Sequence, residues 1–497
     1  MAEVLHSYDN VKIMEGESGQ IPYYVYLAPE LTDEERRILG NCRTIVGDTN
    51  ATTAQLTNIR TTGEKEAYLR EFLRGKIKNL NVKPENAEYM VSSMMDEVFL
   101  GYGRLGPLIR DEQLEEIMVN NVNSPVFVVH RRYGMCITNL MYETHEPLNN
   151  LVQWLARYAN RELSEQNPLL DAQMPDGSRV NVAIPPAAPF GPAVTIRKFR
   201  KIPYNILDLI ELGSISTELA AFLWVCIEGL GLSPVDLILA GGAGSGKTTL
   251  LNALAMFIPK TERVITVEDT MELNFDFIEN WVPLEASPTA TDQSNYMSMH
   301  SMLRNSLRMR PDRVIVGEVR GSEAETLFVA MDIGLDGSMG TLHANNARET
   351  TIRLMGEPMN VPIRMMPLLN LIVVINRLPD RKKGGMYRRV TQVAEVSGTE
   401  GDVVHLGDIF AYDITTDAIK RTNYPILLLE KIANKCGITK KTLLTELLVR
   451  EKVLQYMINK GIKDNSEVVR FFHIYHCDPK AILSRLKKDG QMPNIQE

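Results

Sequence analysis

One segment restricts the fold of this chain more than any other. Residues 241–248 read Gly-Gly-Ala-Gly-Ser-Gly-Lys-Thr, which is the G-x-x-x-x-G-K-T pattern of a phosphate-binding loop. The apolar run 235–240 before it has the length of a buried strand, and 248–258 after it carries apolar residues at helical spacing. A strand, a glycine-rich turn and a helix in this order place backbone N–H groups around the β-phosphate of a nucleotide. The sequence therefore predicts an α/β domain built around a P-loop.

The residues of this loop predict the cofactors. Lys247 brings a mobile positive charge to the β- and γ-phosphates of ATP, and the hydroxyl of Thr248 is placed to bind Mg²⁺. The remaining nucleotide contacts are expected from the rest of the loop and the next residue: Gly241, Gly242, Ala243, Gly244, Ser245, Gly246 and Thr249. We therefore expect ATP and Mg²⁺ as cofactors.

Acidic residues follow two of the strands predicted after the P-loop. Glu268 and Asp269 come at the end of one strand, and Glu318 comes at the end of the next one, 313–317. The second strand looks like a Walker B strand in which Gly317 replaces the usual aspartate. Because the carboxyl ends of parallel strands build the sites of open α/β sheets, Glu268 and Glu318 are predicted to be catalytic. The expected metal shell consists of Thr248, Asp269 and Glu318.

A histidine closes a further apolar strand. His343 directly follows the run 339–342. A histidine at that edge can donate a hydrogen bond to an oxygen of the γ-phosphate and respond to its hydrolysis. We therefore predict His343 as a third catalytic residue.

The composition is typical of a globular protein with several domains. A chain of 497 residues is too long for one core, and a soft expectation is about three domains. No apolar run approaches the length of about 18–20 residues that a membrane helix needs, and 1–10 does not resemble a signal peptide. We therefore expect a cytoplasmic protein without a transmembrane segment of its own. The net charge of −8 argues against nucleic acid as a partner, and five scattered cysteines without C-x-x-C predict no zinc module.

The order of predicted strands and helices indicates a fold of mixed class. Short strands, turns and three helices in the first part predict an α+β domain, with helices at 63–78, 84–101 and 148–163 and a hairpin of strands 127–130 and 136–140. Alternating strands and helices after 235 predict an α/β, RecA-like P-loop domain whose sheet is largely parallel and ends in two antiparallel strands, 388–396 and 403–412. The predicted division is a partly flexible extension 1–62, the α+β domain 63–205, a linker and helix 206–234, the RecA-like domain 235–424 and a helical C-terminal region 425–497.

Four segments together are more specific than the P-loop alone. They are the loop itself and the segments 267–270, 316–321 and 340–346, which read Val-Glu-Asp-Thr, Val-Gly-Glu-Val-Arg-Gly and Gly-Thr-Leu-His-Ala-Asn-Asn. The set resembles the secretion-ATPase superfamily of type II secretion, type IV pili and archaella, in which the segments are the Walker A, Asp box, atypical Walker B and His box. The resemblance covers roughly 100–480. Within the family, 130–136 and 307–312 look most like the archaellum motor ATPases, and the missing cysteine module separates the chain from bacterial type II and pilus-assembly ATPases.

The resemblance implies a machine made of several copies of the chain. It implies a homohexameric ring, with an N-terminal domain joined by a mobile linker to the RecA-like domain and with the nucleotide between them. By motif, Arg179 and Arg197 are the arginines that reach the phosphates when this domain closes. It also implies a polytopic membrane platform protein and cytoplasmic accessory proteins as partners, and a place in the cytoplasm at the inner face of the cell membrane.

Four functions remain open at this point. The first is an ATPase that assembles the archaellum and, as a further option, rotates it. The second is an archaeal adhesion-pilus or type II-like secretion ATPase. A DNA-translocating RecA-like motor is the third, and the acidic net charge speaks against it. A nucleotide-bound scaffold without hydrolysis is the fourth, and Lys247, Glu318 and His343 speak against it.

Overall fold

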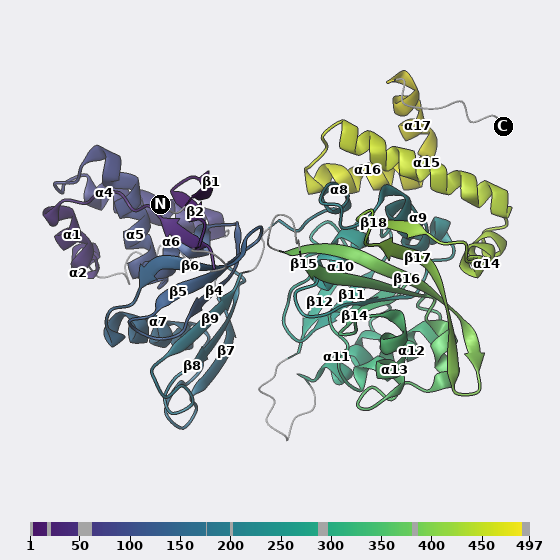
Figure 1. Ribbon diagram of the computed structural model, residues 1–497, viewed down its shortest axis with the longest axis horizontal. Helices are drawn as coiled ribbons and strands as arrows, with labels where there is room; N and C mark the ends of the chain where they lie inside the picture. Colours follow the sequence, from purple (N-terminus) through teal and green to yellow (C-terminus); the bar gives the residue numbers. More distant parts are fainter. Residues whose placement is uncertain are drawn as a thin grey trace. The chain divides into compact units, whose positions relative to one another are not determined.

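The chain forms two compact units (Figure 1). This computed structural model describes residues 3–16, 21–47, 62–174, 176–198, 202–286, 297–379 and 386–489. Among the described residues, those up to 198 belong to the N-terminal unit and those from Ile202 onward belong to the C-terminal unit. The finer division into five segments stays a prediction, and of the predicted extension 1–62 the residues 1–2, 17–20 and 48–61 lie outside the described residues.

The N-terminal unit contains a nine-stranded sheet with the order β1-β2-β3-β6-β5-β4-β9-β8-β7. Neighbouring strands are antiparallel except for the pair β3 and β6. The predicted hairpin is confirmed as β5 and β6. The strands are β1 Val4–Tyr8, β2 Val11–Met14, β3 Tyr23–Tyr26, β4 Leu114–Val119, β5 Pro125–His130, β6 Gly134–Met141, β7 Leu169–Gln173, β8 Arg179–Ala183 and β9 Ala193–Arg197.

The helices of this unit differ from the predicted ones at their ends. The helix predicted at 148–163 is α7, His145–Tyr158, and it stops early because Asn160 has a left-handed backbone with φ of +51°. The helix predicted at 84–101 is divided into a 3₁₀ turn Pro84–Asn86, α5 Ala87–Met94 and a π-turn Met95–Phe99. The other helices described here are α1 Asp33–Gly40, α2 Cys42–Val46, α4 Thr62–Ile77 and α6 Gly106–Arg110.

The C-terminal unit contains a second nine-stranded sheet, with the order β12-β11-β13-β14-β10-β15-β16-β17-β18. The first six strands are parallel, which confirms the largely parallel RecA-like sheet, and three antiparallel strands follow. Of these, β16 and β17 were predicted, and the short strand β18 at the edge was not. The strands are β10 Leu237–Ala240, β11 Val264–Glu268, β12 Trp281–Glu285, β13 Arg313–Val316, β14 Met339–Leu342, β15 Leu371–Pro379, β16 Met386–Glu400, β17 Val403–Asp413 and β18 Ala418–Arg421.

Helices cover both faces of this sheet (Figure 1). On β10, Leu237 and Leu239 pack into a cluster with α8, α9, α10 and the C-terminal helices, whereas Ile238 and Ala240 pack with α12 and α13 on the other face. This alternation follows from the two-residue period of a strand that is buried on both sides. The helices are α8 Ile206–Glu211, α9 Thr217–Glu228, α10 Lys247–Ala255, α11 Met299–Ser306, α12 Glu323–Asp332, α13 Ala347–Met355, α14 Leu427–Lys435, α15 Lys440–Asn459, α16 Asn465–Cys477 and α17 Pro479–Lys488.

The helical C-terminal region is joined to the sheet layer by a buried ion pair. Arg450 of α15 pairs with Glu228 at the end of α9, and both side chains are almost completely buried. The guanidinium also lies over the rings of Trp224 and Tyr475, 4.7 and 5.3 Å from their centroids. Since a buried charge is costly unless it is paired, these contacts fix α15 against α9. In the described part of the chain, no helix has both the length and the apolar character to span a bilayer.

Candidate nucleotide site

The P-loop lies at the carboxyl end of the central strand β10. The predicted contacts Gly241, Gly242, Ala243, Gly244, Ser245, Gly246, Lys247, Thr248 and Thr249 all fall between the last residue of β10 and the first turn of α10. Gly246 precedes the helix with φ of +98°, a conformation that residues with a Cβ rarely adopt. The sequence folds in this way because β10 is apolar at every position and the loop is rich in residues that tolerate sharp turns. This arrangement is a ready site for a phosphate.

The side chains of Lys247 and Thr248 already have partners within the unit. The ammonium of Lys247 donates to the carbonyl oxygens of Gly241 and Gly242 at 3.0 and 3.1 Å, and the side chain is buried. The hydroxyl of Thr248 donates to Oε2 of Glu272 at 3.2 Å. Glu272 was not predicted, because it follows its strand by four residues instead of ending it. Its carboxylate beside the expected Mg²⁺ ligand makes it a further candidate for the metal shell.

Glu268 is the last residue of β11 and is 2 % exposed. Its Oε2 accepts hydrogen bonds from the backbone N–H groups of Glu272 and Leu273 at 2.8 and 3.0 Å. Within the described residues, its other oxygen, Oε1, is buried without a hydrogen-bond partner. Burial raises the pKa of Glu268 to about 7, against the lowering effect of the two backbone donors. Such a carboxyl can take up or release a proton near neutral pH.

The side chain of Glu268 also explains the unusual glycine in the Walker B segment. A Cβ added at Gly317 would lie 2.7 Å from Cγ and 3.1 Å from Oε2 of Glu268. Both distances are shorter than an ordinary van der Waals contact, so any larger residue at position 317 would collide with this carboxylate. Glu268 therefore occupies the space beside the strand that the usual aspartate would need.

Glu318 lies at the centre of a polar cluster beyond β13. Its Oε1 lies 2.8 Å from Nε2 of His343, and Arg320 pairs with its Oε2. Arg320 also reaches Oδ2 of Asp269 at 3.3 Å. The structure thus brings together the carboxylates and the histidine predicted from three different strands. Arg320 was missed, although its position two residues after Glu318 in Glu-Val-Arg could have suggested it.

The charges of this cluster set its protonation states. Burial would raise the pKa of Glu318, but the hydrogen bond and charge of Arg320, with smaller effects of His343 and Lys247, lower it overall. Burial and the nearby charge of Lys247 lower the pKa of His343, and the charge of Glu318 opposes them only in part. Near pH 7, Glu318 is therefore ionised and His343 is mostly neutral.

Arg179 and Arg197 lie in the N-terminal unit. They are directly opposite each other on the antiparallel strands β8 and β9, so the structure brings these two residues together. Arg179 also pairs with Asp171 through two hydrogen bonds of 3.1 and 2.8 Å. The predicted contact of both arginines with phosphates stays a prediction.

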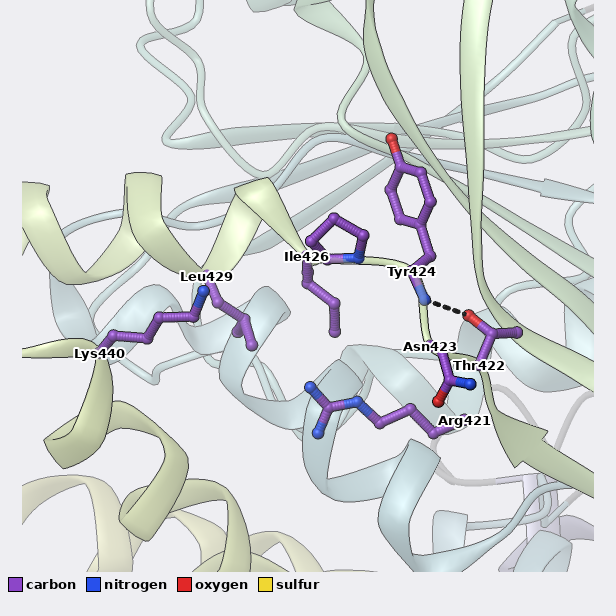
Figure 2. Close-up of a pocket in the computed structure, with 8 residues that line it drawn as sticks. Arg421, Thr422, Asn423, Tyr424, Ile426, Leu429 and Lys440 are labelled. Carbon is purple, nitrogen blue, oxygen red and sulfur yellow. Dashed lines mark hydrogen bonds between the residues drawn. The ribbon is translucent and has the colours of Figure 1, made fainter.

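A hollow of about 460 Å³ lies in another part of the C-terminal unit (Figure 2). It lies where β18 leads into α14 and α15, and a backbone N–H of Tyr424 donates to Thr422 within it. It contains none of the predicted site residues. Its lining residues are Arg421, Thr422, Asn423, Tyr424, Pro425, Ile426, Leu429 and Lys440.

Comparison with known proteins identifies the family. The family model described as "Type II/IV secretion system protein" matches residues 101–469. The chain belongs to this family. The P-loop, the acidic cluster and His343 all lie within the matched residues.

The alignments with several similar proteins cover most of the length of those proteins. The uncharacterized protein MJ0781 of Methanocaldococcus jannaschii is 28% identical over 84% of this chain and 81% of its own length. The type IV secretion system protein PtlH of Bordetella pertussis is 32% identical over 58% of this chain and 92% of its own length. Among solved structures, the VirB11 ATPase from the Brucella suis type IV secretion system is 26% identical over 59% of this chain and 92% of its own length, with a TM-score of 0.30. The assignment to the family rests on the family model and the sequence relatives.

Proposed function

We propose that this chain hydrolyses ATP to ADP and phosphate and that the reaction drives mechanical work on a filament or secretion machinery. One observation carries the proposal. Beside the P-loop lysine, Glu318 lies 2.8 Å from His343, and the buried Glu268 lies against the same strand end with one oxygen unpartnered among the described residues. A nucleotide-bound scaffold needs the loop but not this second set of groups.

The proposed roles follow from the contacts. Lys247 and the N–H groups of the loop bind the β- and γ-phosphates, and neutral His343 redirects its single N–H from Glu318 to a γ-phosphate oxygen. Glu318 orients the attacking water, and Oε1 of Glu268 accepts its proton. The water oxygen bonds to the γ-phosphorus while the bond from that phosphorus to the β–γ bridging oxygen breaks, which leaves ADP and phosphate. Arg179 and Arg197 add positive charge in the transition state.

The oxygen donors of the site fit Mg²⁺. Thr248 and Glu272 place a hydroxyl and a carboxylate within 3.2 Å of each other at the start of α10, and Asp269 and Glu318 lie further along the same edge. Among the described residues, no three His, Cys, Asp or Glu side chains form a metal site by themselves. Mg²⁺ suits such a site, since it is usually held by one or two protein oxygens together with phosphates and water. When bound, it neutralises charge on the phosphates.

The machine that we propose is the archaellum, with a homohexameric ring of this chain docked on a polytopic membrane platform protein at the cytoplasmic face of the membrane. Support comes from the family and from the segments 130–136 and 307–312, which look most like archaellum motor ATPases. The alternative is an archaeal adhesion-pilus or type II-like secretion ATPase. A DNA-translocating motor is least favoured because the chain carries a net charge of −8.

Two experiments test the proposed ATP hydrolysis and the proposed cellular machinery separately. Phosphate release by the full chain with ATP and Mg²⁺ should be clear for the wild type and lost in Lys247→Ala. Equal phosphate release by both proteins would overturn the hydrolase proposal. Deleting the gene in the source cells should then remove archaella and leave adhesion pili and secreted proteins unchanged. Intact archaella with missing pili or a missing secreted protein would instead favour the alternative.

A further inference from the structure

A two-stranded part of the sheet extends beyond the central strand and lies beside the P-loop. β10 ends at Ala240, which pairs with Val374, but the parallel strand β15 continues to Pro379. The extra residues of β15 pair with the beginning of β16 (Figure 1). Because β15 and β10 run in the same direction, this extension passes the carboxyl end of β10, where the phosphate loop begins.

Two arginines of this extension reach the loop. Arg377 and Arg388 are directly opposite each other on β15 and β16, so their side chains leave the same face of the sheet. Nε of Arg388 donates to the carbonyl oxygen of Gly244 at 3.0 Å. The position that a Cβ of Gly244 would occupy lies 3.9 Å from Nη1 of Arg377. Both guanidinium groups therefore lie against the same turn of the P-loop.

Arg377 and Arg388 place two like charges at directly opposite positions of the sheet. Like charges directly opposite each other destabilise an antiparallel pair. The next residue, Arg389, lies on the opposite face and forms two hydrogen bonds of 2.9 Å with Asp417, which is the usual structural use of such a side chain. On the loop face, the two charges instead lie beside a site for an anionic ligand. The arrangement suits a phosphate group that both guanidinium groups can share.

The strand order indicates which end of the nucleotide they meet. Glu318 and His343 follow β13 and β14, on one side of β10, and β15 and β16 lie on its other side. Since the first side holds the groups for γ-phosphate cleavage, an extended nucleotide directs its nucleoside end toward the second side. We propose that Arg377 and Arg388 bind the α-phosphate of the nucleotide. This inference rests on the proposed function, because it takes the P-loop ligand to be ATP or ADP.

Such contacts predict a distinct kinetic signature. The α-phosphate changes little during the reaction, so its contacts are equally strong in the ground state and the transition state. Contacts of this kind lower KM and Kd without raising kcat. Loss of either arginine should therefore weaken the binding of ATP and of ADP to a similar extent. The effect should be the same whichever base the nucleotide carries.

The test is the affinity of the full chain for ADP and GDP, measured by calorimetry. Arg377→Ala is the cleaner variant, because in the described part of the chain Arg377 has no hydrogen-bond or ion-pair partner to lose. We expect Kd to rise about 10- to 100-fold for both nucleotides, as for loss of a charge-assisted hydrogen bond. KM for ATP should rise by a similar factor, while kcat falls much less. Arg388→Ala should act in the same direction and Arg388→Lys less strongly.

The controls separate this inference from the proposed function. Arg470→Ala, which removes an exposed arginine of α16, should leave Kd and the melting temperature unchanged. Lys247→Ala should lose nucleotide binding. An Arg377→Ala protein with wild-type Kd would refute the inference. Weaker binding of ADP with unchanged binding of GDP would also refute it, since that result indicates recognition of the base. A lower kcat with unchanged Kd would refute it as well. If the wild type binds neither nucleotide, the proposed function itself is wrong.

Discussion

A single methyl group at Gly317 tests the packing that underlies the proposed catalytic edge. An ideal Cβ at this position lies 2.7 Å from Cγ of Glu268. Favourable carbon–carbon contacts are about 3.5–4.0 Å, so Glu268 must move by roughly 1 Å to accept the methyl group. The carboxylate is buried and accepts two backbone hydrogen bonds, and both bonds weaken when it moves.

This displacement predicts two effects of Gly317→Ala. Overpacking of this kind costs about 1–3 kcal/mol of unfolding free energy. A misplacement of about 1 Å at a reacting group can cost about 100-fold in rate, so kcat should fall by that order while ADP affinity is kept. Gly317→Asp restores the usual Walker B aspartate, and it should be worse than Gly317→Ala because the larger side chain meets the same obstacle.

Urea unfolding and steady-state phosphate release measure both effects. The matched control is a double-mutant cycle with Glu268→Ala, which removes the Cγ that the new methyl group would meet. In that background, Gly317→Ala should cost less than about 0.5 kcal/mol, since the two sites are then nearly independent. The reasoning is refuted if Gly317→Ala alone has the stability and kcat of the wild type, or if its cost is the same in both backgrounds.

Four further predictions use other parts of the structure. Glu318→Gln should bind ATP normally and lose about 10²–10⁴ in hydrolysis rate, and near-normal turnover would remove Glu318 from the mechanism. Arg179→Ala and Arg197→Ala should each lower kcat more than they raise KM, because their charge is proposed to act in the transition state. Arg450→Ala should destabilise the chain by about 1–3 kcal/mol in urea unfolding, since the buried carboxylate of Glu228 then keeps only His476 as a partner; a loss below about 0.5 kcal/mol contradicts this. Burial lowers the pKa of His130 from 6.5 to about 4. As the pH falls from 6.5 to 4, the unfolded chain therefore binds a proton at this histidine before the folded chain does, and the free energy of unfolding should decrease. In His130→Asn, this decrease should be smaller.

The sequence predicted the centre of the second sheet better than its edges. β10 is a short apolar run, β13 and β14 are apolar apart from Arg313 and Thr341, and all residues of the three strands are buried. Such runs are a direct signal for parallel strands covered on both faces. β12 was not predicted, because it alternates between exposed and half-buried positions and contains a proline, as edge strands can.

The candidate site was predictable only where spacing along the chain carries the information. The P-loop and the residues that end strands could be named in advance, because parallel strands bring their carboxyl ends to one edge. The bond from Thr248 to Glu272 and the approach of Glu268 to Gly317 depend on side-chain directions after the strand has ended. The paired arginines Arg377 and Arg388 depend on the register of a hairpin, and a shift of one residue would place one of them on the other face.

The sheet order gives the two sides of the P-loop opposite chemical character. The strands on one side of β10 carry Glu268, Glu318 and His343, and those on the other side carry Arg377 and Arg388. Bond cleavage needs groups that orient water and accept a proton, whereas holding a nucleotide before and after cleavage needs fixed positive charge. Variants on the first side should therefore change kcat and variants on the second side KM. If variants on both sides changed kcat and KM alike, the nucleotide would not extend across β10 from the γ-phosphate on the first side to the nucleoside on the second.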